Sequence, residues 1–259
     1  KLHMGTGISP FADMAHKNRL GWLFPIIYCG ALIGPLAAAL MYANSASRSV
    51  YGSSKNGYLP LFFQHLTAQG NPWIAIIMNF FVGMALFAPL PGWDRMITFL
   101  TSLMALTYAI GPVSLLSLRY QLPDQRRPFR LPIACLWTTS ALFICTLITY
   151  FSGWHIISKF SIALVIGFVV FFSYHRFSKR GRQVKLDWMQ ALWLWVYLLG
   201  ITLISYLGNF GGGRGLIPFG YDFLAVVVLC VIVMILAVRY RLPAEETQKY
   251  IAELKLPGS

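Results

Sequence analysis

The sequence predicts an all-α integral membrane protein with about seven transmembrane helices. Of the 259 residues, 57% are hydrophobic and only 11% are charged, whereas a typical soluble domain carries roughly 25% charged residues. The mean hydropathy of +0.63 implies more apolar surface than a soluble chain of this size could bury, whereas a bilayer accepts such surface. The alternating pattern of transmembrane strands is absent, so the prediction is helices rather than a barrel.

Seven apolar runs are long enough, or nearly so, to cross a bilayer as helices, which satisfy their own backbone hydrogen bonds in lipid. The predicted spans are residues 21–44, 73–90, 96–118, 131–151, 155–174, 188–207 and 222–238. Lys159 lies a turn in from one end of its span and is expected to extend towards the headgroups. Asp222 begins the last span, where the helix dipole favours an anion. No buried acid suited to a proton relay is expected in these spans.

Two connections carry predictions of their own. Only Ser152 to Trp154 separate two of the spans, which predicts a tight antiparallel hairpin. The glycine-rich stretch at residues 208–215 follows no strand and lacks the Gly-Lys-Ser/Thr ending of a phosphate-binding loop. This stretch is therefore interpreted as a flexible loop on the outer side of the membrane.

Lys and Arg residues are distributed unequally between alternating loops. The formal net charge is +13, and fifteen of the 21 Lys and Arg residues lie in four segments. These segments are residues 45–72, 119–130, 175–187 and 239–259. Because cytoplasmic loops carry such an excess, the N-terminus is predicted outside and the C-terminus in the cytoplasm, in a bacterial inner membrane. The dispersed charge disfavours a nucleic-acid partner, and residues 175–185 are expected to contact anionic lipid headgroups.

These features predict an organisation in seven segments. An outer loop is followed by three helices, a basic cytoplasmic loop, a helical hairpin, a second basic loop, two C-terminal helices and a cytoplasmic tail. The corresponding boundaries are 1–20, 21–118, 119–130, 131–174, 175–187, 188–238 and 239–259.

No constellation of reactive side chains points to an enzyme. The four cysteines lie in apolar runs without a Cys-x-x-Cys spacing, and the five histidines are scattered in loops or at the ends of the spans. Paired acids, a metal-ligand cluster and a nucleophile with a base are all lacking. The sequence therefore predicts no catalytic residue, no metal site and no cofactor.

Two stretches outside the apolar runs carry a family resemblance. The first follows the first span and contains Arg48, Gly57, Leu59, Pro60 and Pro72. The second follows the third span and contains Arg119, Pro123, Asp124, Arg127, Pro128, Phe129 and Arg130. Together they resemble the amino acid–polyamine–organocation permeases after their eighth and tenth helices. The family usually has Asp where this chain has Asn56, which weakens a role for a carboxylate there.

The resemblance implies a LeuT-like transporter fold of five-plus-five inverted repeats, of which this chain is the C-terminal part. The first span corresponds to the eighth helix, and the last two spans are extra helices that some subfamilies have. The broken first and sixth helices, which build the substrate site in such transporters, belong to a missing N-terminal half. The implied function is secondary transport of an amino acid, by proton-coupled symport or by exchange. A small or acidic amino acid is a family-level expectation.

The polar residues of two spans are candidates for lining the substrate path. They are Tyr42, Asn44 and Ser45 in the first span and Thr101, Ser102, Thr107 and Tyr108 in the third. The alternative is that they only join neighbouring helices. The arginines of residues 119–130 are expected to set orientation and to pair with Asp124 or with lipid headgroups.

Three other functions are compatible with parts of the sequence. A seven-helix receptor or retinal protein fits the number of spans, but the last span lacks a Schiff-base lysine. A membrane-embedded enzyme has no reactive constellation to support it. An inactive fragment of a permease fits a chain that begins at Lys1.

Overall fold

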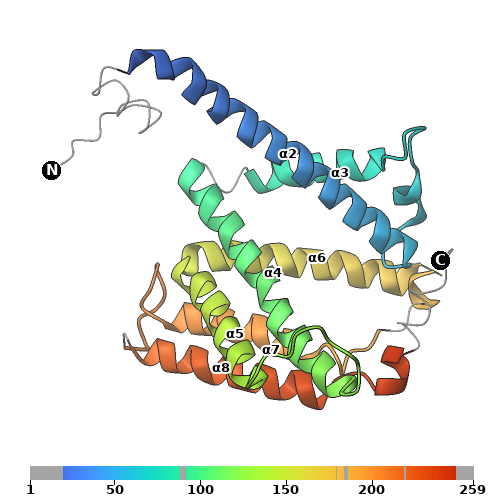
Figure 1. The fold of residues 1–259 in the computed structure, drawn as a ribbon, viewed down its shortest axis with the longest axis vertical. Coiled ribbons are helices and arrows are strands. Elements are labelled where there is room, and N and C mark those ends of the chain that lie inside the picture. The colour runs from blue at the N-terminus through green and yellow to red at the C-terminus, as the bar shows by residue number, and fades with distance from the viewer. Residues whose placement is uncertain (1–19, 88–91, 179, 184–185, 219, 249–259) are drawn as a thin grey trace. The chain divides into compact units, whose positions relative to one another are not determined.

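The computed structural model describes residues 20–87, 92–178, 180–183, 186–218 and 220–248 (Figure 1). In these residues the regular structure is entirely helical. The α-helices are α2 (Phe24–Lys55), α3 (Trp73–Phe87), α4 (Trp93–Gln121), α5 (Ala134–Phe151), α6 (Trp154–Phe177), α7 (Leu192–Leu207) and α8 (Tyr221–Arg239). Short 3-10 turns are η1 (Gly21–Leu23), η2 (Leu61–Gln64) and η3 (Gly181–Gln183). Nearly all of the predicted outer loop, residues 1–20, lies outside the described residues.

The seven α-helices fall on the seven predicted spans, which confirms the all-helical fold class. Five of them, α2, α4, α5, α6 and α8, are long and apolar enough to cross a membrane. The other two, α3 and α7, are apolar but have only 15 and 16 residues. The boundary of α2 differs from the prediction, because the helix continues to Lys55 instead of ending at residue 44. The last turns of α2 are polar, so hydropathy does not predict that they are helical.

The chain forms two compact units, which are described separately. The first consists of residues 1–86 and 177–183, and the second of residues 87–176 and 184–259. The first unit contains α2 with η2 packed at its C-terminal end. The second unit is a helical bundle in which α5 contacts α4, α7 and α8.

The predicted tight hairpin of α5 and α6 is wrong as a packing arrangement. The turn is as short as predicted, but the two helices diverge from it and do not pack along their lengths. Side chains of α6 instead contact α7 and the segment just before it, and along α6 they are spaced seven, seven and four residues apart. The contacting pairs are Trp154 with Tyr206, Ser161 with Thr202, Phe168 with Trp195 and Phe172 with Trp188.

A buried polar contact joins α5 to α8. The Tyr150 hydroxyl donates to Asp222 Oδ2 over 2.6 Å, while Asp222 Oδ1 accepts the backbone N–H groups of Gly220 and Phe223 at 2.9 and 3.0 Å. Asp222 is fully buried in the first turn of α8. Its place at the helix N-terminus is the predicted one, and its burial was not predicted; the expectation that these spans contain no buried acid suited to a proton relay stays a prediction.

The glycine-rich connection between α7 and α8 is packed, contrary to its interpretation as a flexible loop. Gly211 has φ +66° and lies so close to Gly153 that a Cβ on either residue would overlap the backbone of the other. The Gly211 carbonyl also accepts the N–H of His155 over 3.3 Å. The connection therefore fits against the α5–α6 turn, and the glycines allow this close approach.

Candidate functional site

The candidate residues on α2 form a polar stretch on the exposed surface of the first unit. Tyr42 is 61% exposed, and Asn44 and Ser45 are also exposed. Asn44 Oδ1 accepts the Nε–H of Arg48 over 3.2 Å, one turn further along the helix. The hydroxyl of Ser47 is buried and donates to the Asn44 carbonyl over 2.9 Å. Tyr42 is therefore the large candidate side chain that this helix leaves exposed.

The candidate residues on α4 divide into an exposed group and one buried residue. Thr101, Thr107 and Tyr108 are exposed, and both threonine hydroxyls donate to a carbonyl one turn earlier in their own helix. Ser102 is only 3% exposed, and its hydroxyl lies 2.5 Å from that of Ser152 at the end of α5. Ser102 thus joins α4 to the α5–α6 turn, whereas the other three face away from the bundle.

The first family motif ends α2 in a Schellman arrangement. The N–H of Gly57 donates to the Ser54 carbonyl and the N–H of Tyr58 to the Ser53 carbonyl, both over 3.0 Å. These are the two hydrogen bonds that define the Schellman C-cap. They require a left-handed backbone conformation at the residue just past the helix cap, which here is residue 57. Gly57 has φ +85° and supplies that conformation without a steric penalty. The motif glycine is therefore required by the backbone.

The prolines of this motif fix the chain that follows. Ser54 Oγ donates to the carbonyl of Pro60 over 2.6 Å, which holds the turn against the end of α2. Pro60 immediately precedes η2, and Pro72 is fully buried immediately before α3. The Pro72 carbonyl accepts the N–H of Ile76. Proline suits such positions because it presets φ and no N–H is needed there.

In the second motif the arginines bind backbone carbonyls. Arg127 donates to the carbonyls of Leu118 and Leu122 at 3.2 and 2.8 Å, and Arg119 donates to the carbonyl of Leu131 at 2.8 Å. Arg127 thereby adds side-chain donors to carbonyls at the end of α4, where a cation is favoured by the helix dipole. Within the part of the chain that the structure describes, neither arginine forms an ion pair with Asp124, and pairing with lipid headgroups stays a prediction.

Between the two arginines, the chain reverses direction in a short turn. Pro123 and Asp124 are its central residues, and the N–H of Gln125 closes it by donating to the Leu122 carbonyl over 3.4 Å. Proline favours the second position of such turns because its φ is fixed. Pro128, Phe129 and Arg130 follow in exposed, non-helical chain.

A polar cavity of about 530 Å³ lies in the second unit where α4 begins and the α5–α6 turn reverses the chain. Its walls include Arg95 and Thr98 of α4, Ser152 in the turn, and His155 and Lys159 of α6. Three side chains that are or can become cationic thus face one hollow. These residues lie on separate segments of the sequence, and only the fold brings them together. The described residues contain no cluster of acids, histidines and cysteines that could hold a metal ion.

The chain is similar to known transporters. Residues 3–172 match the family described as amino acid permease. The glutamate/serine transporter AimA of Bacillus subtilis is 28% identical over 89% of this chain and 43% of its own length. The aspartate-proton symporter of the same organism is 27% identical over 85% of this chain and 42% of its own length. The branched-chain amino acid permease BcaP is 26% identical over 66% of this chain and 39% of its own length.

The extent of these matches limits what they describe. The chain spans less than half the length of these relatives. The family match covers both motif loops and ends within α6. No solved structure matches the chain.

Proposed function

Because the chain belongs to the amino acid permease family, within the amino acid–polyamine–organocation superfamily, we propose that it is part of a secondary transporter that carries amino acids across the cytoplasmic membrane. The chain is an integral membrane protein, with five helices that are long and apolar enough to span a bilayer. The observation that carries the proposal is the family match over residues 3–172. It leaves no support for the receptor hypothesis, which gives the two motif loops no role.

In this proposal the chain supplies the second part of the transporter. Helix α2 corresponds to the eighth helix of the permease and α4 to the tenth, while α7 and α8 are the extra C-terminal pair. The register rests on the two motif loops, which follow α2 and α4 as they follow those helices in the family. The first and sixth helices, whose broken segments bind substrate in such folds, belong to an N-terminal half outside this sequence.

The proposed orientation places the four basic segments in the cytoplasm and the N-terminus outside, in a bacterial inner membrane. The polar cavity of Arg95, His155 and Lys159 then opens towards the outer side. Alkaline phosphatase and green fluorescent protein fusions after residues 125 and 212 test this arrangement. Fluorescence at the first position and phosphatase activity at the second are expected, and the reverse pattern contradicts the orientation.

The proposed substrate is a small or acidic amino acid, taken up with protons. Two relatives named for glutamate, serine and aspartate support this choice, and the word symporter in one name supports proton coupling. The cationic lining of the polar cavity also favours an anionic solute. The proposal assigns the coupling carboxylate to the N-terminal half, since Asp222 is held by Tyr150 and two backbone groups.

Uptake by the purified full-length parent permease in proteoliposomes tests the function. Labelled aspartate, glutamate and serine are supplied with and without an inward proton gradient. We expect accumulation of at least one of them that depends on the gradient, whereas uptake of no amino acid would overturn the proposal. The 259-residue chain alone is expected to transport nothing because the proposed substrate-binding backbone is absent from it.

The exposed candidate residues are proposed to line the substrate path. They are Tyr42, Asn44, Ser45, Thr101, Thr107 and Tyr108, with Ser102 forming the wall behind α4. In the full-length permease, Tyr42→Ala should raise KM at least several-fold because a wall of the path is lost. Met41→Ala is the control, since Met41 is the adjacent residue and is 73% exposed but points in a different direction around the helix. Equal effects of the two substitutions contradict the assignment of Tyr42.

A further inference from the structure

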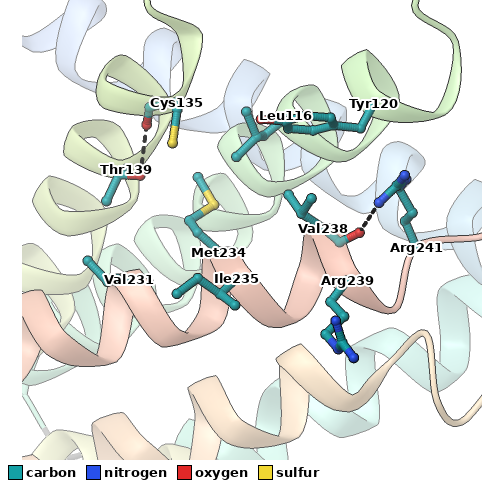
Figure 2. A pocket seen from close by; sticks show the side chains of 10 residues that line it. All are labelled: Leu116, Tyr120, Cys135, Thr139, Val231, Met234, Ile235, Val238, Arg239 and Arg241. Atoms are coloured by element: carbon teal, nitrogen blue, oxygen red, sulfur yellow. Dashed lines mark hydrogen bonds between the residues drawn. The ribbon is translucent and has the colours of Figure 1, made fainter.

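An apolar cavity of about 580 Å³ lies at the end of the second unit where α4 and α8 finish and α5 begins (Figure 2). Leu116 and Tyr120 come from α4, Thr139 from α5, and Met234 and Val238 from α8. Its volume falls within the range of about 300–1,000 Å³ that small-molecule sites occupy. The cavity is large enough to hold an apolar chain between three helices.

A second, more polar cavity of about 280 Å³ adjoins the apolar one. The two cavities share Tyr120, Arg239 and Arg241, and the second adds Gln121 and the first residues after α8. Hydrogen-bond donors thus gather at the helix ends, whereas the wall further along α8 is aliphatic. The combined hollow is apolar along its length and cationic at one end.

The two arginines are positioned for an anion at this end. The Arg241 guanidinium lies over the ring of Tyr120, 5.7 Å from its centroid, and donates one bond to the Val238 carbonyl over 2.6 Å. These contacts hold the planar group in place and leave other N–H donors free. Arg239 extends from the opposite side of α8 in Figure 2. Both side chains are exposed, and neither pairs with a carboxylate among the described residues.

We propose that this hollow binds an anionic phospholipid, with an acyl chain along Leu116, Thr139 and Met234 and the phosphate at the end that Arg239 and Arg241 line. The helix ends that form the mouth belong to basic segments, so the proposed orientation places the mouth at the cytoplasmic headgroup level. Basic pockets between transmembrane helices on that side recognise acidic headgroups. A free anion would leave the apolar cavity unfilled, and a neutral lipid would not use the two guanidinium groups.

Native mass spectrometry of the delipidated full-length permease, titrated with phosphatidylglycerol or phosphatidylcholine, tests the proposal. Replacing Arg239 and Arg241 with Gln should weaken phosphatidylglycerol binding by about fivefold for each arginine. Phosphatidylcholine binding should change little. The matched control replaces Arg126 and Arg130 with Gln, which removes the same charge from exposed positions outside both cavities, and it should weaken phosphatidylglycerol binding much less than the cavity variant does.

A second variant tests the acyl-chain part without changing charge. Thr139→Phe places an aromatic ring in the apolar cavity and should weaken the binding of both lipids. Unchanged phosphatidylglycerol binding in both cavity variants overturns the proposal, as does an equal loss in the control. A dimer that these variants dissociate, with no lipid bound in the parent protein, would identify a second copy as the occupant and also overturn it.

Discussion

Replacing Tyr150 with Phe should destabilise the second unit by about 1.5 kcal/mol, because it removes a hydrogen bond to a buried carboxylate. Hydrogen bonds to charged groups contribute roughly 1.5–3 kcal/mol, but polar pairs between membrane helices average only about 0.6 and reach about 1.7. The Tyr150–Asp222 bond is short at 2.6 Å and fully buried, which favours the upper part of the membrane range. Asp222 keeps its two backbone donors, so its charge is not left unsolvated.

The free energy of unfolding can be measured by reversible unfolding of the 259-residue chain in mixed micelles with increasing dodecyl sulfate. Tyr197→Phe is the matched control, because it removes the same hydroxyl from a neutral pair with Thr146 at 3.1 Å. We expect about 0.6 kcal/mol for that substitution. Tyr197 is as buried as Tyr150, so the two substitutions leave voids of similar size and differ in the charge of the partner.

A double-mutant cycle with Asp222→Asn isolates the pairwise contribution. The Asn amide accepts a weaker bond from the Tyr150 hydroxyl, so the two substitutions should be non-additive by about 1 kcal/mol. Additive effects, or a loss no larger than that of Tyr197→Phe, would refute the conclusion that the charged hydrogen bond joins α5 to α8.

Two further predictions each compare a substitution with a matched control to find the cause of a loss of stability. Gly153→Ala should destabilise the protein more than Gly70→Ala in a thermal unfolding assay. Both residues have positive φ, but only at Gly153 would a Cβ meet another backbone segment, 2.8 Å from the Cα of Gly211. Equal losses would contradict a role for this close contact and leave only the backbone conformation as the cause. Arg127→Lys should lower the Tm by a few degrees without changing the membrane topology, because lysine keeps the charge but cannot reproduce the planar pair of donors. Arg126→Lys is the control. An unchanged Tm or an inverted topology reporter in Arg127→Lys would contradict this prediction.

The fold class could be predicted because lipid imposes one simple requirement on sequence. An apolar run of about twenty residues must be helical in a bilayer, and the seven runs appear as seven helices. The polar end of α2 carries no such signal, so hydropathy does not predict the extension of the helix to Lys55. Hydropathy also does not predict whether two consecutive helices pack together. The connection at Ser152 and Gly153 is short, yet the aromatic residues of α6 contact α7.

The candidate site was only partly predictable for a related reason. Individual polar residues such as Tyr42 can be recognised in an apolar helix, but contacts between distant segments cannot. Tyr150 and Asp222 are separated by 72 positions, and nothing in either span signals the other. The glycine-rich loop has a composition typical of flexible chain, although here its glycines allow close packing against the α5–α6 turn.

Arginines of the basic segments do two things at the ends of the helices: they carry the charge that favours one orientation in the membrane, and they donate hydrogen bonds to backbone carbonyls. In the proposed orientation the C-terminal ends of α2, α4 and α8 are cytoplasmic, and each helix end leaves carbonyls without partners. An arginine donates to a carbonyl at every one of these ends: Arg180 to Lys55 in the first unit, Arg127 to Leu122 and Arg241 to Val238 in the second.

The outer ends are completed differently. Helices α5 and α7 finish in turns in which Gly153 and Gly208 donate their own N–H groups to carbonyls of the last turn. Glycine and arginine thus both complete helix C-termini, as Gly57 and Arg180 do together at the end of α2, and only arginine also carries charge that could orient the chain. An arginine that donates to a carbonyl keeps its charge and its other N–H groups. Arg241, which donates to Val238, and Arg239 therefore both remain able to bind a headgroup.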